Sequence, residues 1–562
     1  MAWDVLVRGG TVVDGTGASA RTADVGIVDG RIAAIGRLDT AARRTIDADG
    51  CVVAPGFIDP HTHYDAQICW DPLLTPSSWH GVTTVVAGNC GVGLAPCRPE
   101  AREIATRDLV NVESIAYEVL EQGIEWEWES FAQYLDAADA RRPALNLAWL
   151  APLTPFRHFV MGEDSMARAA NAHETERIAA LVGQALDAGA FGLSTTIMAQ
   201  HMGYGGQPLA CRRASTQELC RYAAELARRD RGIVQIALTR QLGVLDEEEA
   251  QLLQTLLDAA QRPVTFIALF DRDDKPEASR EVLARIAPMA ARGVRPQVSP
   301  LPLTREIDLR KPFSFAAFPA FKRVFADLSP PALRATYADP AFRAQFRHDL
   351  LRPANFGNWE RIALHEAQHP ALRPLEGRSI AELARQANRD PVDTFLDLAL
   401  QDDLRALFTM VSFNTRVDRM TELLNRPEIL VGLGDAGAHL DMLCDAGYPT
   451  YLLGTWVRER GALSMERAVA MLTSEPADAF GLSGRGRLAP GLAADITVFD
   501  PARVGSAPRT ERLHDLPSGA KRMVMRSQGI ACTLVSGVPV WSSGQTTGER
   551  PGRVLRSGQT HA

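Results

Sequence analysis

The sequence predicts an α/β fold in which a parallel (β/α)8 barrel is combined with a small β-domain built from both ends of the chain. Through the middle of the chain, short strands rich in Val, Ile and Leu alternate with amphipathic helical segments, which is the pattern of βα repeats. Both ends instead carry short β-rich runs separated by Gly-containing turns. A chain of 562 residues with 46% hydrophobic content is long enough to bury a large core of this kind.

Residues 1–56 are expected to form the N-terminal part of the β-domain. Asp29-Gly30 separates two of their β-rich runs and is typical of a tight hairpin turn. Residues 484–562 continue in the same style, with strand patterns at 495–500 and 533–540. Neither end alone would bury much of a core, so we expect the two ends to pair into one domain.

Residues 57–483 are expected to form the barrel. This segment is long for a (β/α)8 barrel, so we expect an insertion at about 300–374, which is rich in Phe, Pro and Arg. Its aromatic side chains are expected to make the insertion's own core. These aromatic residues are Phe313, Phe315, Phe318, Phe321 and Phe325, and the strand candidates of the barrel include 83–87, 233–237, 264–269, 295–298 and 429–433.

Charge and composition favour a small-molecule partner. The formal net charge of -8 arises from residues scattered without long like-charge blocks, which argues against a nucleic-acid groove and against binding to an anionic membrane. The start of the chain lacks a signal-like pattern and no 18-residue apolar run follows, so we expect a cytoplasmic protein. Homo-oligomerisation is left open by the sequence.

The segment 55–65 carries the strongest chemical motif. It reads Pro-Gly-Phe-Ile-Asp-Pro-His-Thr-His-Tyr-Asp, so His61 and His63 follow a short apolar strand one residue apart. Alternate residues of a strand share a face, so both imidazoles can point at one ion while Thr62 points away. This spacing predicts a metal site at the end of the first barrel strand.

Two further segments carry side chains suited to the same ion. Cys90 lies in a Gly-Asn-Cys-Gly motif after a β-branched strand, and Asp435 lies in a Gly-Asp-Ala-Gly motif after the strand at 429–433. In a parallel barrel, the loops at the carboxyl ends of the strands converge on one face. We therefore expect Cys90 and Asp435 to meet the two histidines despite their separation in sequence.

With these motifs, the chain resembles the amidohydrolase superfamily and, within it, the D-aminoacylase (N-acyl-D-amino-acid deacylase) group. The resemblance covers nearly the whole chain and implies a (β/α)8 barrel with a β-sandwich from both termini and a divalent metal, usually zinc, at the barrel mouth. It also implies that Cys90 stands in the place of the superfamily's bridging carboxylated lysine. Beside the histidine motif, the matching segments are 9–17, 88–91, 192–195, 434–435 and 488–496.

Three positions depart from the group's pattern. The group places metal-binding histidines at the ends of strands five and six, where this chain has Leu238 and Leu269. Leucine cannot coordinate a metal, so the ion position that depends on those histidines should be empty. Asp271 stands where the group has a lysine that holds the substrate carboxylate, and an acidic group there would repel a carboxylate.

We therefore expect one ion, with His61, His63, Cys90 and Asp435 as its candidate ligands. Binding by all four would close a tetrahedron, whereas catalysis needs an open position. Asp435 is thus expected to bind weakly at most and to act as the general base for a metal-activated water. Mixed nitrogen, sulfur and oxygen ligands suit Zn²⁺ best, although other divalent metals can enter such a site.

Other polar residues are candidates for substrate contact or for support of the ligands. Polar loops at the active face can supply oxyanion or ligand groups, and arginine can hold a carboxylate through two parallel hydrogen bonds. Each candidate also has an ordinary alternative, a hydrogen bond to the backbone or a surface ion pair. The substrate-binding candidates are His439, His201, Arg240 and Arg212; Asp65 and Asn89 are expected to orient the ligands.

The leading functional hypothesis is a metal-dependent hydrolase of a linear, non-peptide C–N amide bond, with an N-acyl amino acid-like substrate. Hydrolysis of a cyclic amide, imide or lactone is an alternative that the barrel and metal equally permit. A metal-dependent C–C bond-cleaving enzyme or lyase is a third reading, because the altered strands five and six reshape the site. A non-catalytic binding module would leave the four candidate ligands without a purpose.

Overall fold

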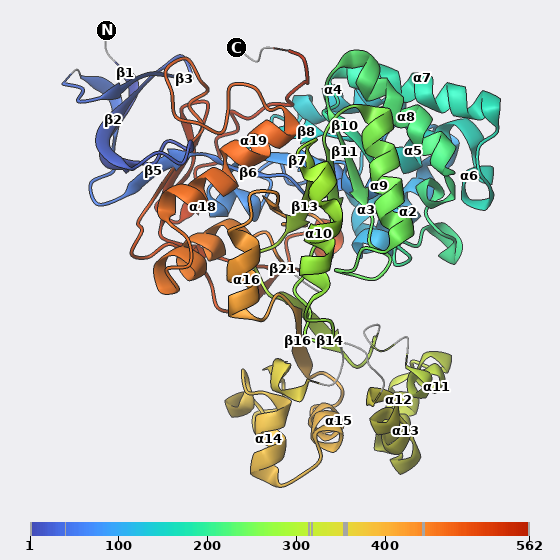
Figure 1. Cartoon of the computed structure of the whole chain (residues 1–562). Helices are drawn as coiled ribbons and strands as arrows, with labels where there is room; N and C mark the ends of the chain where they lie inside the picture. The colour runs from blue at the N-terminus through green and yellow to red at the C-terminus, as the bar shows by residue number, and fades with distance from the viewer. Residues whose placement is uncertain are drawn as a thin grey trace. The chain divides into compact units, whose positions relative to one another are not determined.

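The computed structural model describes residues 3–39, 41–312, 315, 318–351, 358–440 and 444–559. The chain divides into two compact units (Figure 1). Each unit has buried hydrophobic clusters of its own. The first unit contains Met1–Phe270, Ala278–Leu301 and Thr421–Ala562, and the second contains Asp271–Glu277 and Pro302–Met420.

The first unit contains the parallel barrel, which confirms the predicted fold class. One run of strands has the order β6-β7-β8, and the other has the order β17-β13-β12-β11-β10-β9. The two runs are connected on one side because β9 follows β8 directly along the chain. On the other side, a parallel bridge between Thr62, after β6, and Ala436, after β17, joins them. The strands are β6 (Phe57–Asp59), β7 (Val82–Ala87), β8 (Asn146–Trp149), β9 (Ala151–Pro152), β10 (Gly192–Thr196), β11 (Ile233–Ala237), β12 (Val264–Ile267), β13 (Val294–Val298) and β17 (Leu430–Val431).

Helices cover the outside of the barrel, as in Figure 1 for α8, α9 and α10. α7, α8 and α9 each begin at a capping box, in which a polar residue and a glutamate three positions later satisfy the first amide groups. The helices of this unit include α2 (Arg102–Glu113), α3 (Tyr117–Gly123), α4 (Phe131–Ala140), α5 (Leu153–Met161), α7 (Ala172–Ala188), α8 (Thr216–Arg229), α9 (Glu247–Ala260), α10 (Ala278–Ala290), α18 (Met465–Leu472) and α19 (Ser474–Phe480).

Both ends of the chain pair in one sheet of the first unit. The sheet has the order β25-β24-β23-β18-β5-β1-β2-β3, with β4 paired to β1, and its seam is the antiparallel pair of β5 and β18. Asp29 and Gly30 both have positive φ between β2 and β3, which is the hairpin turn that their sequence predicts. The strands are β1 (Trp3–Val12), β2 (Arg21–Val28), β3 (Arg31–Gly36), β4 (Ala42–Asp47), β5 (Val52–Pro55), β18 (Ile496–Phe499), β23 (Ile530–Val535), β24 (Val538–Ser542) and β25 (Gln545–Thr546).

The second unit is a small sheet of order β14-β16-β15 with helices around an aromatic core. Phe315, Phe318 and Phe321 belong to that core and Phe325 packs against it, while Phe313 lies outside the described residues. The unit extends past the expected 300–374 to Met420, because β16 pairs with both other strands. Its elements include β14 (Leu303–Asp308), α11 (Lys322–Ala326), α12 (Pro330–Ala338), α13 (Pro340–Leu350), β15 (Ile362–Glu366), α14 (Ile380–Ala387), α15 (Pro391–Gln401) and β16 (Leu407–Phe413).

In the part of the chain that the structure describes, no helix combines the length and the apolar character needed to cross a lipid bilayer.

Candidate metal centre

His61 lies just past β6, in a fully buried position fixed by two neighbouring strands. Its Nδ1 atom is 2.8 Å from Gln297 Oε1, and Gln297 Nε2 donates in turn to Thr265 Oγ1 at 3.2 Å. Because the amide nitrogen of Gln297 faces Thr265, its oxygen faces the imidazole and accepts the proton of Nδ1. This arrangement leaves Nε2 of His61 as the nitrogen with a free lone pair.

His63 lies between two carboxylates. Its Nδ1 atom is 3.2 Å from Glu113 Oε1, and its Nε2 atom is 3.6 Å from Asp435 Oδ1. The side chains of His63 and Glu113 are 4% and 2% exposed, so the pair is shielded from water. Both histidines therefore turn Nε2 towards Asp435, an arrangement compatible with the expectation that the two rings point at one ion.

Cys90 follows β7 in a tight turn with φ 57°. Its backbone amide donates to Gln235 Oε1 at 2.7 Å, and its Sγ atom lies 3.4 Å from His61 Nε2. Gly88 before it has a positive φ, and a Cβ there would lie 2.5 Å from the carbonyl oxygen of Leu150, so the turn requires glycine. The turn thus aims the thiol at the imidazole.

Asp435 lies in the loop after β17. Its Oδ1 atom is 3.4 Å from His61 Nε2, and its backbone amide donates to the carbonyl oxygen of His61 at 3.0 Å. A Cβ at Gly434 would lie 2.1 Å from Asp59 Oδ2, so the preceding position also requires glycine. The side chain of Asp435 is 23% exposed, whereas that of His61 is fully buried, which makes Asp435 the more accessible of the two.

The candidate ligand atoms of His61, His63 and Cys90 all lie within 4.8 Å of one another. With the Asp435 carboxylate beside both imidazoles, the donor set is two nitrogens, one sulfur and one oxygen, and this set fits a divalent ion such as zinc. The structure thus brings together all four residues that the sequence nominates as ligands. Their roles towards a metal remain predictions.

Burial dominates the acid–base properties of these groups. It lowers the pKa of His61 to about 4 and raises the pKa of the Cys90 thiol to about 11. Burial opposes ionisation of Asp435 as well, but the adjacent His63 imidazole and the histidine charges outweigh it and hold the pKa of this carboxyl below its usual range. A bound cation would favour the thiolate of Cys90, because coordination displaces the thiol proton.

Leu238 and Leu269 follow β11 and β12, and both are fully buried. The resemblance implies metal-binding histidines at these two positions, and leucine offers no donor atom. Asp271 is compensated within the second unit, because Arg416 Nε donates to its Oδ1 at 3.0 Å. The repulsion of a carboxylate that its charge alone suggests is therefore reduced.

The loop that carries His201 is held by Arg212. The guanidinium Nη1 of Arg212 donates to the carbonyl oxygens of Ala199 and His201, at 3.2 and 3.0 Å. Burial, together with the charges of His439 and His63, lowers the pKa of His201 to about 3. His201 is thus electrostatically coupled to the centre, while Arg212 supports its loop through backbone contacts.

His439 and Arg240, two other candidates for substrate contact, have different surroundings. His439 has φ 52° and its amide donates to the carbonyl oxygen of Glu113 at 2.6 Å, which places its backbone beside the centre. Arg240 instead pairs with Glu248 at 2.9 Å, and its side chain is 49% exposed. Arg240 therefore forms a surface ion pair, which was the alternative to substrate binding, because the acidic first turn of α9 lies next to it.

The two residues expected to orient the ligands are buried and hydrogen-bonded. Asp65 accepts from the amide of Gly88 at 3.2 Å and from Trp149 Nε1 at 3.3 Å, so it steadies the turn before Cys90. Asn89 Nδ2 donates to the carbonyl oxygens of Val86 at 2.9 Å and Thr62 at 3.3 Å. Both side chains therefore join the loops after β6 and β7.

Sequence reasoning missed three polar residues of the centre. Gln235 and Gln297 lie at buried positions of the barrel strands, and Gln235 in particular interrupts an otherwise apolar strand, which is a usable signal. Glu113 is the last residue of α2, and nothing in its local sequence distinguishes it from a surface glutamate. Only the position of α2 reveals its contact with His63.

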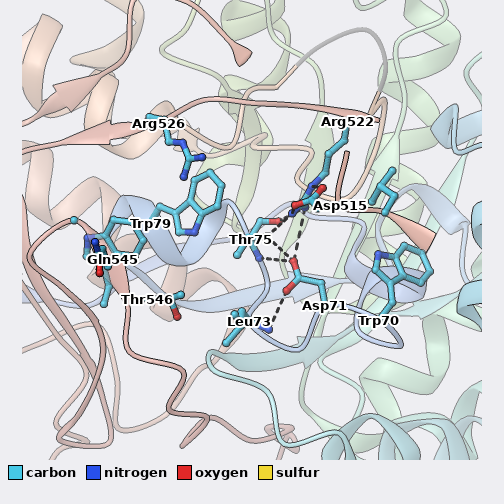
Figure 2. Close-up of a pocket in the computed structure, with 13 residues that line it drawn as sticks. Trp70, Asp71, Leu73, Thr75, Trp79, Asp515, Arg522, Arg526, Gln545 and Thr546 are labelled. Atoms are coloured by element: carbon cyan, nitrogen blue, oxygen red, sulfur yellow. Dashed lines mark hydrogen bonds and ion pairs between the residues drawn. The ribbon is translucent and has the colours of Figure 1, made fainter. Parts of the chain in front are cut away.

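A separate cavity of about 520 Å³ lies in the first unit (Figure 2). Trp70, Trp79 and Arg522 contribute to its lining, and none of the four candidate metal ligands does. Figure 2 shows Arg522 directed at Asp515 and Thr75, to which it donates hydrogen bonds. The buried guanidinium is thus satisfied by the protein itself.

His80, the last residue of the short helical turn Ser77–His80 before β7, has both ring nitrogens engaged. Nδ1 lies 2.7 Å from Thr450 Oγ1, and Nε2 lies 2.9 Å from the carbonyl oxygen of Met525. Burial lowers the pKa of His80 to about 4, so the ring is neutral at neutral pH. His80 is a structural residue.

The fold and the site define a barrel protein with a buried cluster of candidate metal ligands at the carboxyl ends of its strands. The chain belongs to the amidohydrolase family, whose profile matches residues 44–541. It is 30% identical to a D-aminoacylase of Alcaligenes xylosoxydans xylosoxydans, over 98% of this chain and 97% of that protein.

Two similar solved structures are also deacylases of amino acid derivatives. One is an N-acyl-D-glutamate deacylase from Bordetella bronchiseptica, in complex with zinc and a phosphonate that mimics the tetrahedral intermediate. It is 28% identical in sequence, with a TM-score of 0.66, and the match covers 99% of this chain and 100% of that chain. The other is a D-aminoacylase with a binuclear metal centre, which one metal activates and a second metal attenuates. It is 27% identical in sequence, with a TM-score of 0.66, and the match covers 99% of this chain and 100% of that chain.

Proposed function

We propose that the protein is a metal-dependent amidohydrolase that hydrolyses the linear C–N amide bond of an N-acyl amino acid-like substrate. One divalent ion, with zinc as the expected metal, would be held by His61, His63 and Cys90 beside Asp435. The observation that carries this proposal is the convergence of these four side chains, with Asp435 Oδ1 at 3.4 and 3.6 Å from the two imidazole nitrogens. Family membership and the deacylase relatives support the reaction class.

The residues of the chain suit the proton transfers of amide hydrolysis. When bound, a divalent ion lowers the pKa of water and polarises a carbonyl group. Asp435, ionised and partly exposed, is placed to accept a proton from the attacking water. As the water oxygen bonds to the carbonyl carbon and the C–N bond breaks, the protonated Asp435 gives that proton to the leaving nitrogen. The immediate products are a carboxylic acid and an amine, which then ionise to a carboxylate and an ammonium group.

A single ion is supported by Leu238 and Leu269. Both side chains are fully buried hydrocarbon. A second ion would need nitrogen donors at these two positions, and leucine supplies none. The binuclear centre of the D-aminoacylase relative is a property of that protein. In this chain, one ion is proposed beside Asp435, and the position that would need nitrogen donors at Leu238 and Leu269 is proposed to be lost.

The test is a substrate screen of protein reconstituted with zinc. N-acyl-D-amino acids, N-acyl-L-amino acids, cyclic amides, imides and lactones are offered in parallel, and product formation is followed by mass spectrometry. Turnover of a linear N-acyl amino acid, lost after chelation and restored by one equivalent of zinc, is expected. Activity confined to the cyclic substrates would contradict the proposal.

A further inference from the structure

We infer that Glu113 is a positioning residue of the metal centre, which fixes the orientation and the tautomer of His63 as a ligand. This inference rests on the proposed function, because it assumes that a cation binds at Nε2 of His63. Glu113 comes from α2, a helix outside the barrel strands that supply the four candidate ligands.

The first observation is the isolation of the His63–Glu113 pair. Nδ1 of His63 and Oε1 of Glu113 are both buried, and among the described residues neither atom has a hydrogen-bond partner. They lie 3.2 Å apart, at ion-pair distance. Burying an ionised carboxylate without an opposite charge costs free energy. The imidazole of His63 is therefore the group that offsets the burial of the Glu113 carboxylate.

The second observation is that the backbone of Glu113 contacts the other side of the centre. Its carbonyl oxygen accepts the amide proton of His439 at 2.6 Å, and His439 lies in the turn in which the amide of Ala438 donates to the carbonyl oxygen of Asp435. Glu113 therefore joins the loop after β6, through its side chain, to the loop after β17, through its backbone.

The third observation is that the last turns of α2 also hold the loop of His201. Asn111 Nδ2 donates to the carbonyl oxygen of Gly203 at 2.7 Å, and the amide of Tyr204 donates to Asp108 Oδ1 at 2.7 Å. Asp108 is itself fixed by His158 Nε2 at 2.9 Å. The end of α2 is thus anchored rigidly enough to set where the Glu113 carboxylate lies.

The physical consequence concerns metal affinity more than stability. A carboxylate at Nδ1 selects the tautomer with the proton on Nδ1, leaves the Nε2 lone pair for a cation, and makes the imidazole a stronger donor. Loss of such a partner typically weakens metal binding by about 10- to 100-fold. Gln keeps the size of the side chain and removes only the charge, while Glu113→Asp keeps the charge, so the two variants together separate an effect on metal affinity from the loss of a buried ion-pair partner.

The test is the zinc dissociation constant of the full-length chain, measured at pH 8 by competition with a chromophoric chelator. Glu113→Gln keeps the shape and removes the charge, and its Kd is expected to rise about 10- to 100-fold. Glu113→Asp keeps the charge but withdraws it by one methylene, and an intermediate rise is expected. Cobalt-substituted protein gives a second readout, because a displaced imidazole shifts the visible absorption bands.

Glu103→Gln is the matched control, since Glu103 lies on the same helix in an exposed pair with Arg107. Its Kd should equal that of the parent chain. An unchanged Kd and cobalt spectrum in both Glu113 variants would overturn this inference and leave the proposed function intact. A raised Kd in the Glu113 variants, without turnover of any linear amide by the parent chain, would support this inference and overturn the proposed function. A parent chain that binds no zinc would overturn both the inference and the proposed function.

Discussion

Replacement of Asp435 by asparagine tests the assigned proton transfer most directly. The substitution keeps the size of the side chain and removes its charge, while the ligand atoms of His61, His63 and Cys90 remain within 4.8 Å of one another. The ion should therefore stay bound. A positioned general base typically contributes about 10²- to 10⁴-fold to the rate, which corresponds to about 3 to 5 kcal/mol of transition-state stabilisation.

The assay combines kcat for the best linear amide with the zinc content of the same sample. Asp435→Asn is expected to lower kcat by about 10²- to 10⁴-fold at unchanged zinc content. Asp258→Asn, on the exposed face of α9, serves as a control with normal turnover. Activity of Asp435→Asn within a few-fold of the parent chain would refute the assignment, and loss of zinc together with activity would show that Asp435 acts mainly as a ligand.

Three further predictions concern other parts of the first unit. Cys90→Ala removes the sulfur donor and should abolish zinc retention through gel filtration, whereas retention of a full equivalent would exclude Cys90 as a ligand. Leu238→His combined with Leu269→His should raise the metal content from one ion to two per chain, and a folded double variant that still binds one ion would contradict the proposed origin of the single site. His80 has a pKa lowered to about 4 from 6.5, so the unfolded state binds more protons between these values and stability falls as pH falls through this window, by up to about 1.4 kcal/mol per pH unit. The gap in unfolding free energy between the parent chain and His80→Gln should narrow from pH 7.5 to pH 4.5 in urea titrations, and a constant gap would contradict this reading.

The barrel and the paired ends could be predicted because each depends on local pattern. Apolar runs alternating with helical periodicity specify βα repeats wherever they occur, and Asp29-Gly30 adopts the turn conformation that its sequence prefers. The length of the second unit was harder to predict. Its end at Met420 depends on the pairing of β16 with β14 and β15, and strand pairing across long loops leaves little local signal.

The metal-ligand candidates also divide into features that local sequence pattern predicts and features that depend on long-range contacts. The sequence by itself determined that His61 and His63 present their rings to one point, because alternate residues of a strand share a face, and that Cys90 and Asp435 follow other strands of the same barrel. Only the tertiary structure decided that Glu113 meets His63. A helix outside the barrel can approach any loop, and no periodicity in its own residues specifies which buried side chain its last carboxylate will contact.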